Sequence, residues 1–398
     1  MLYRRFLKSI LLILFAIVTF SCEKDNDTQL PYEPDFLAFY EKVRTYSRQD
    51  VLTVLSESGI ALPGMEFFIQ HDVDVIRLDY HTVDVDGHDI IASGALVVPV
   101  SGTGNSVLSF QHGTIYNPYE APSVAGSYYM DVGAFLSSTG FITVMPDYLG
   151  YGSSSQTDHP YQHRQTLATA TRDMIRASYE YFKVEELKDP SDKLFLTGYS
   201  QGGYATLATL KLIQEEHAGE FNIRAATAGS GPYNKTETLK NLLSLDQEYE
   251  SINTYMWVLD VYNSIYPALN RPYTYYYNEP WADMIEQQGV FADVNKNPAT
   301  LFTDAFRMDV LEGTDQVIKD VLADNDLFSW KPSVPLQLYH GTDDLLVPFF
   351  NSQTTYDAMI ESGASNIELK PVEGADHLTA FWDYIVGTFT FFIPKLAS

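Results

Sequence analysis

The stretch "LFLTGYSQGGYATLATL", residues 194–210, decides the fold. Its first three residues form a short apolar run typical of a buried strand, and from Tyr204 onward apolar residues recur at helical spacing. Ser200 therefore lies at a turn between a strand and a helix, with Gly198 and Gly202 two positions to either side. Small residues at these positions relieve the crowding of such a sharp turn. A serine held there projects its hydroxyl away from the sheet, as a nucleophile requires.

The helix that follows Ser200 adds a second part of such a site. The first N–H groups of a helix have no intrahelical partner, and they favour negative charge in front of them. The backbone N–H of Gln201 is therefore a candidate donor to an oxyanion that develops next to Ser200. A G-x-S-x-G pattern also arises by chance, but the strand before it and the helix after it favour the nucleophile interpretation here.

Strand and helix patterns alternate along most of the chain. We expect a helix over about 35–58 and then two antiparallel strands, near 71–84 and 89–100, joined by the turn signal Asp86-Gly87. Further strands are predicted at 107–111, 141–145, 193–197, 222–228, 336–339 and 367–372, with helices between them that include 165–181 and the one after Ser200. This alternation predicts an α/β fold, with a mostly parallel sheet, an antiparallel start and helices on both faces.

One long segment, residues 233–331, interrupts this alternation. It contains helical patches, three of the four tryptophans and the run "PYTYYYNEPW". A structureless loop of this length is implausible in a compact domain, so we predict a helical cap inserted into a core made of 35–232 and 332–398. Its aromatic side chains are expected either to line a pocket over the strand ends or to pack the cap onto the core.

The first 21 residues predict a signal peptide. A basic start precedes an apolar run over 10–20, which is too short to span a bilayer comfortably. Cys22, the only cysteine, follows directly, and the pattern resembles a bacterial lipoprotein signal. We therefore expect an exported protein with lipid on Cys22, a flexible tether over 22–34 and anchorage to a bacterial membrane. The acidic run in the tether resembles signals that send lipoproteins to the cell surface.

The charge of the chain limits its partners. The formal net charge is −27. Nucleic acid and anionic lipid head groups should repel so acidic a protein, so we expect no nucleic-acid partner and membrane contact only through the anchor at Cys22.

A serine nucleophile needs a histidine base and a carboxylate that orients it. After the 233–331 segment the chain has two histidines. His377, in "VEGADHLTAFWDYI", lies between a predicted strand and a predicted helix, where a loop can bring the imidazole over the strand ends. His340 ends its own strand and is interpreted as structural. The predicted acid lies in "LYHGTDDLLVPF" and is either Asp343 or Asp344. The aspartate that does not orient the histidine is expected to cap the turn, which is a common role of Asp at such positions.

A second oxyanion donor is expected in the loop "QHGTIY", which follows the strand at 107–111. Gly113 permits a close backbone approach, so the N–H of Thr114 is the predicted donor, helped by its hydroxyl. We interpret His112 as a histidine that packs in this loop rather than as a metal ligand.

The order of these motifs carries a family resemblance. "HGT", "PDYLGYG", "GYSQGG" and "HGTDDLLVP", with a trailing "GADH", resemble the α/β-hydrolase superfamily over about 70–398, and within it the chain is similar to secretory lipases and bacterial lipoprotein esterases. The resemblance implies an α/β-hydrolase fold with about eight strands, a cap over the site and a serine esterase mechanism. It assigns the acid role to Asp344, and it implies a structural role for Asp147.

The sequence thus predicts a serine hydrolase that cleaves carboxylic esters of small-molecule or lipid substrates through an acyl-enzyme. Two alternatives stay open. A serine peptidase on the same fold usually carries a large extra domain, and too few residues precede residue 70 for one. A surface lipoprotein that binds glycans or lipids without catalysis would not need a complete set of Ser, His and Asp. The predicted site residues are Ser200, His377 and Asp344, with Gln201 and Thr114 as oxyanion donors.

No cofactor or metal is predicted. The sequence contains no HExxH motif, no pair of cysteines and no phosphate-binding glycine loop. His159 and His163 are four residues apart but have no evident third ligand, so packing or capping is the favoured interpretation. The Asp residues around Asp86-Gly87 have the wrong spacing for a calcium loop and are expected to stabilise the turn.

Overall fold

The computed structural model describes residues 32–57, 65–100 and 105–397. The predicted signal peptide, Cys22 and most of the predicted tether lie outside the described residues. From Glu33 onward the described chain forms one compact unit. Among the described residues, no helix combines the length and the apolar character needed to cross a membrane.

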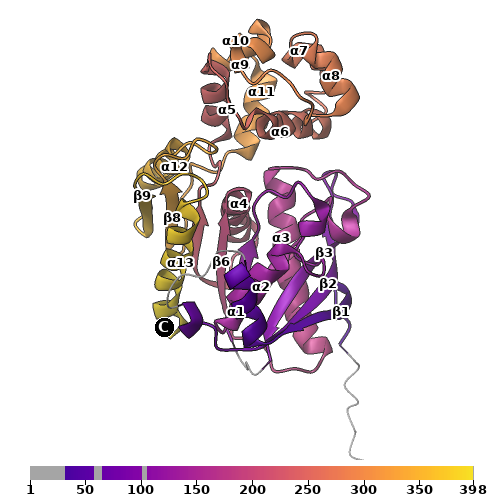
Figure 1. Cartoon of the computed structure of the whole chain (residues 1–398), viewed down its shortest axis with the longest axis vertical. Helices are drawn as coiled ribbons and strands as arrows, with labels where there is room; N and C mark the ends of the chain where they lie inside the picture. The colour runs from indigo at the N-terminus through magenta and orange to yellow at the C-terminus, as the bar shows by residue number, and fades with distance from the viewer. Residues whose placement is uncertain (1–31, 58–64, 101–104, 398) are drawn as a thin grey trace, which may run out of the picture. The chain divides into compact units, whose positions relative to one another are not determined.

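A single mixed sheet organises this unit (Figure 1). In the described residues it has nine strands in the order β1-β2-β3-β5-β4-β6-β7-β8-β9. Pairing is antiparallel from β1 to β5 along this order and parallel from β5 to β9. The strands are β1 (Leu37–Tyr46), β2 (Val73–Val83), β3 (Asp89–Pro99), β4 (Val107–Gln111), β5 (Ile142–Pro146), β6 (Lys193–Tyr199), β7 (Asn222–Gly229), β8 (Leu336–Gly341) and β9 (Ile367–Val372). The predicted α/β class, with an antiparallel start and a parallel remainder, is confirmed.

The first strand corrects one expectation. The predicted helix over 35–58 is wrong for its first half, which forms β1, and only Arg48–Glu57 forms a helix, α1. β1 pairs with β2 along its length, and the carboxylate of Glu180 accepts the backbone N–H groups of Phe36 and Leu37 at 2.8 and 2.7 Å. Tertiary pairing thus overrides the local helical pattern, which also raises the strand number from about eight to nine.

Helices cover both faces of the sheet. One apolar core lies between the sheet and α3, α4 and α12, and another lies between the opposite face and α1, α2 and α13. Strands β4, β6, β7 and β8 are buried over most of their length because helices cover both faces of the sheet there. These core helices are α2 (Tyr128–Ser138), α3 (Arg164–Val184), α4 (Gln201–Glu216), α12 (Phe350–Glu361) and α13 (Ala380–Leu396), together with α1.

The segment between β7 and β8, which the structure describes throughout, is helical (Figure 1, orange). Its helices have an apolar core of their own, in which Leu243, Met256, Phe302 and Phe306 are fully buried. We call residues 233–331 the cap segment. Its helices are α5 (Lys235–Ser244), α6 (Ile252–Ile265), α7 (Tyr273–Tyr276), α8 (Trp281–Gln288), α9 (Pro298–Leu301), α10 (Asp304–Leu311) and α11 (Gln316–Asn325).

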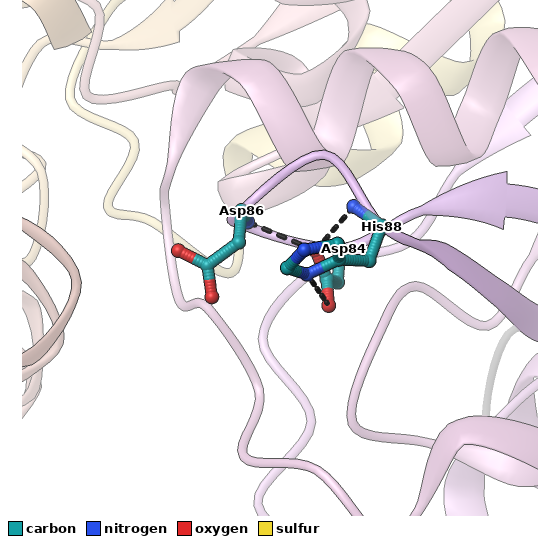
Figure 2. A group of neighbouring side chains, drawn as sticks. All are labelled: Asp84, Asp86 and His88. Atoms are coloured by element: carbon teal, nitrogen blue, oxygen red, sulfur yellow. Dashed lines mark hydrogen bonds and ion pairs between the residues drawn. The ribbon is translucent and has the colours of Figure 1, made fainter.

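The acidic turn between β2 and β3 is a hairpin connection (Figure 2). Asp84 Oδ1 accepts the backbone N–H groups of Asp86 and His88, both at 2.9 Å, and Gly87 supplies the positive φ of +80°. His88 Nδ1 lies 3.7 Å from Asp84 Oδ2, while the Asp86 and His88 side chains are exposed. The Asp84 carboxylate is therefore occupied in stabilising the turn.

Candidate active site

Ser200 occupies a strained turn between β6 and α4. Its φ of 59° and ψ of −123° lie outside the regions that most residues adopt. A Cβ on Gly202 would lie 1.9 Å from the carbonyl oxygen of Gln111, and one on Gly198 would lie 2.3 Å from the carbonyl oxygen of Gly202. Both contacts are with backbone, so neither position has room for a side chain. The two glycines therefore allow the turn to form against β4, with Ser200 at its tip.

His377 links Ser200 to Asp344. Its Nε2 lies 2.9 Å from Ser200 Oγ, and its Nδ1 lies 2.7 Å from Asp344 Oδ2. A carboxylate only accepts hydrogen bonds, so Nδ1 carries the proton and Nε2 presents its lone pair to the serine hydroxyl. His377 and Asp344 are buried and Ser200 is half-buried, so one end of this series of hydrogen bonds reaches the cavity described below.

The two adjacent aspartates have different environments. Asp344 is 3% exposed, and its Oδ1 accepts the backbone N–H groups of Leu346 and Val347 at 2.9 and 2.8 Å. Asp343 is exposed, and its backbone N–H donates to the carbonyl of Ala375. Of the pair, Asp344 is the one that the structure brings to His377.

The environment of Asp344 keeps it ionised. Burial alone would raise the pKa of its carboxyl, but hydrogen bonds with His340 and His377 lower that pKa to about 2. His340 Nε2 lies 3.3 Å from Asp344 Oδ2 and 2.7 Å from the carbonyl of Val347, while its Nδ1 contacts Ser352 Oγ at 2.7 Å. The contact between His340 and Asp344 was not predicted. The spacing i, i+4 alone does not reveal it, because the chain turns between them.

The loop after β4 lies beside the serine. A Cβ on Gly113 would lie 3.8 Å from Ser200 Cβ, and the N–H of Gly113 donates to Tyr129 Oη at 3.1 Å. The hydroxyl of Thr114 is 2.8 Å from Tyr161 Oη, so that hydroxyl already has a partner. Thr114 and Ser200 line the same cavity. The loop therefore brings backbone groups close to the nucleophile candidate.

His112 and Asp147 hold this loop in place through hydrogen bonds. His112 is buried, with Nδ1 2.7 Å from the carbonyl of Gly113 and Nε2 3.1 Å from the carbonyl of Asp147. The Asp147 carboxylate accepts Ser93 Oγ–H at 2.6 Å and the N–H of Ser123 at 2.9 Å. These contacts match the packing and structural roles that the sequence predicted for the two residues.

The side chain of Gln201 is held by His159, for which the sequence predicted packing or capping. His159 Nδ1 lies 2.7 Å from the carbonyl of Leu149, so it donates there, and Nε2 accepts from the side-chain amide of Gln201 at 2.9 Å. Burial lowers the pKa of His159 to about 3, which keeps the ring neutral and able to accept. His159 is 42 residues from Gln201 in the chain, and no spacing rule connects them.

A cavity of about 470 Å³ opens on Ser200 and His377. Its walls come from the loop after β4, from α2, from the start of α13 and from α6 of the cap segment, which contributes Thr254, Tyr255 and Val258. Most of the lining side chains are apolar or aromatic. The cavity can therefore hold an apolar group against a polar reactive corner.

The aromatic side chains of the cap segment divide between the two expected roles, since Tyr255 lines this cavity and the tyrosine-rich stretch 272–281 does not. Tyr276 and Tyr277 are instead buried in the cap segment's own core. One aromatic contact with the core comes from Trp257 of α6, which stacks on Tyr161 with ring centroids 4.1 Å apart. Small helices need large side chains to form a core of their own, so the stretch is used for packing.

Comparisons with known proteins give the family of this chain. The family model for secretory lipases matches residues 128–390, which is more than half of the chain. "Lipase 5" of Candida albicans is 22% identical over 346 residues, which is 74% of this chain and 66% of that protein. The "Secreted triacylglycerol lipase LIP5" of Malassezia globosa is 24% identical over 375 residues, covering 85% of this chain and 74% of that protein. This chain thus spans about two thirds to three quarters of the length of these relatives.

A solved structure extends the likeness to the fold. A point variant of the rice cell wall degrading esterase LipA from Xanthomonas oryzae matches with a TM-score of 0.78 and 24% identity, covering 90% of this chain and 98% of that one. The predicted α/β-hydrolase fold and the predicted likeness to secretory lipases are both confirmed. The chain belongs to the secretory lipase family, a family of carboxylic-ester hydrolases.

Proposed function

We propose that this protein hydrolyses carboxylic esters through an acyl-enzyme, with Ser200 as nucleophile, His377 as general base and acid, and Asp344 as the group that orients His377. The observation that carries the proposal is the hydrogen-bonded series from Asp344 Oδ2 through the imidazole of His377 to Ser200 Oγ. It ends in a cavity and next to a helix N-terminus, where a substrate carbonyl and its developing charge find room and stabilisation.

The first half-reaction forms the acyl-enzyme. Ser200 Oγ attacks the ester carbonyl carbon as its proton moves to His377 Nε2. The ionised Asp344 stabilises the imidazolium that results, because its pKa of about 2 keeps it charged throughout. The tetrahedral intermediate then collapses. The bond to the alcohol oxygen breaks, and that oxygen takes the proton from His377 as the alcohol leaves.

The second half-reaction releases the acid. A water molecule attacks the acyl carbon while His377 Nε2 takes its proton, and collapse of the new intermediate breaks the bond to Ser200 Oγ. The serine regains its proton from His377. The net reaction consumes one ester and one water and yields one acid and one alcohol.

We assign the oxyanion donors to the backbone N–H groups of Gln201 and Thr114. Gln201 is the first residue of α4, where N–H groups have no intrahelical partner. The hydrogen bond between the Gln201 side chain and His159 holds this residue, including its backbone N–H, in place. Thr114 follows Gly113, where an added Cβ would lie 3.8 Å from Ser200 Cβ, and Thr114 lines the same cavity as Ser200.

We assign the substrate to lipid or other apolar esters. The cavity next to Ser200 has mainly apolar and aromatic walls, and the related fungal proteins are named as lipases. We also propose that the cap segment, residues 233–331, covers the site as an insertion between the core parts 35–232 and 332–398. The support for this is that α6 contributes three residues to the cavity wall.

A p-nitrophenyl ester series from acetate to palmitate tests the proposal, with a matched p-nitroanilide and a fluorophosphonate probe. We expect ester turnover, labelling of one serine and no release from the anilide, because the leaving alcohol needs less protonation than an amine. Anilide release at a comparable rate would favour the peptidase. Absence of turnover and of labelling would favour the binding protein.

Export and anchoring are a separate proposal. We propose that the chain is exported and attached to a bacterial membrane by lipid on Cys22, on the evidence of the basic start, the apolar run and the cysteine that follows it. Expressed at full length in a bacterium, the native chain should sediment with membranes, whereas Cys22→Ser should not carry lipid and should leave the membrane fraction. Metabolic labelling with a palmitate analogue checks this, and equal labelling of both chains would contradict it.

A further inference from the structure

A second cavity, of about 290 Å³, lies between α1, α2 and α13. Helices α1 and α2 pack against each other on the same face of the sheet as α13. Within the described residues this space is lined almost wholly by apolar side chains. The lining residues are Val54, Leu55, Glu57, Tyr128, Asp131, Val132, Phe135, Leu136, Phe381, Trp382 and Ile385.

This second cavity shares a wall with the cavity at Ser200. Tyr128, Val132 and Phe381 line both spaces. These three side chains therefore lie in the wall between the two spaces, and we call them the partition. Tyr128 and Val132 are four residues apart on α2, so they lie on one face of that helix.

Phe381 places this partition close to the reacting groups. It is four residues after His377, and its ring makes an edge contact with Tyr199, the residue before Ser200, at a centroid distance of 5.2 Å. The acyl chain of an ester bound at Ser200 would therefore reach Phe381 if it followed the apolar wall of the first cavity. The second cavity begins on the other side of that ring.

The chemistry of the second cavity selects its occupant. Its two carboxyl groups belong to Asp131 and Glu57, its lining among the described residues contains no basic residue, and Asp131 Oδ1 already accepts the hydroxyl of Tyr46 at 2.5 Å. An anionic or strongly polar group would be unfavourable there, because its charge would meet like charges and an apolar wall. A hydrocarbon chain suits this lining, because the burial of each methylene contributes favourably to the binding free energy and requires no hydrogen bond.

We propose that the second cavity is the distal part of the acyl-binding site and that the preferred substrates are esters of long-chain fatty acids. This inference rests on the proposed function. The ester carbonyl lies at Ser200, the first methylenes occupy the cavity at the nucleophile, and the far methylenes pass Val132 and Phe381 into the space between α1, α2 and α13. The two acidic residues in the lining disfavour a carboxylate or another anion there, which suits entry of the acyl chain by its methyl end.

The test fills the second cavity without touching the first. Val54 lines only the second cavity, whereas its neighbour Thr53 is exposed on the same helix. In Val54→Trp we expect kcat/KM for p-nitrophenyl palmitate to fall by about tenfold or more, because several methylenes lose their burial, while p-nitrophenyl butyrate changes less than about twofold. Thr53→Trp, the matched control, should leave the palmitate-to-butyrate ratio unchanged.

A second variant guards against misfolding of the first. Phe381→Ala removes the ring from the partition, so the palmitate-to-butyrate ratio should rise by about threefold or more. An unchanged ratio in folded Val54→Trp, or in Phe381→Ala if Val54→Trp does not fold, would overturn the inference. Failure of the native protein to cleave either ester is a different result, because it would refute the proposed ester hydrolysis itself.

Discussion

Ser200→Ala should lower kcat/KM for short esters by about 10⁴-fold or more, with little change in the free energy of unfolding. The loss is large because the variant has no atom that can form the acyl bond, while His377 and Asp344 remain in place. Stability should change little because Ala tolerates the φ of 59° about as poorly as Ser, and the hydroxyl makes only the hydrogen bond to His377. Ester kinetics and urea unfolding measure the two effects.

Ser230 offers a matched control for this experiment. It also has a positive φ, of 41°, it follows β7 beside β6, and its hydroxyl bonds to Tyr199 Oη at 2.9 Å rather than to His377. Ser230→Ala should therefore keep activity within about tenfold and should still react with the fluorophosphonate probe. Native-level turnover by a Ser200→Ala preparation that the probe no longer labels would refute Ser200 as nucleophile.

The arrangement around Ser200 could be predicted because its causes are local. A serine that lies between two glycines, where a strand pattern changes to a helix pattern, is typical of this sharp turn. The glycines are needed because a Cβ at position 198 or 202 would clash with backbone atoms. The positions of His377 and of Asp344 follow from where strands β9 and β8 end, since parallel strands end at the same edge of a sheet. The predicted strand ends were therefore enough to bring Ser200, His377 and one of the two adjacent aspartates together.

Other features depend on contacts that no local pattern encodes. Residues 37–46 read as helical, yet they pair with β2 as its edge neighbour. The tyrosines of 272–281 suit a pocket wall as well as a core, and only the packing of the cap helices decides that Tyr276 and Tyr277 are buried and that Tyr273 and Tyr275 pack against them. The bond between His159 and Gln201 joins a loop to the start of α4. In each case the partner is far away in the chain.

The choice between Asp343 and Asp344 shows the same limit at a single position. Composition and spacing left both residues open, and a family resemblance favoured Asp344. The structure distinguishes them by environment, since Asp344 is buried against two histidines and two backbone N–H groups, whereas Asp343 is exposed. The functional consequence of this difference is measurable.

Asp344→Asn should lower kcat/KM by about 10³ to 10⁴-fold, whereas Asp343→Asn should lower it by less than about tenfold. An amide at 344 can donate to His377 Nδ1, which would favour the tautomer with its proton on Nε2 and remove the lone pair that Ser200 needs. The amide also carries no charge to stabilise the imidazolium. Asp343 has no hydrogen bond to His377, so its loss removes neither effect.

The pH dependence separates this explanation from a general loss of structure. The pKa of Asp344 is lowered from 3.8 to about 2, so its charge is present above about pH 4 and is lost only as the pH falls through about 2. The deficit of Asp344→Asn relative to the native protein should therefore be present throughout the range from about pH 5 to pH 9, because the native carboxylate is charged across it. Kinetics of both variants across that range, with thermal unfolding to show that each is folded, provide the measurement. A larger loss in Asp343→Asn than in Asp344→Asn would assign the orienting role to Asp343 instead.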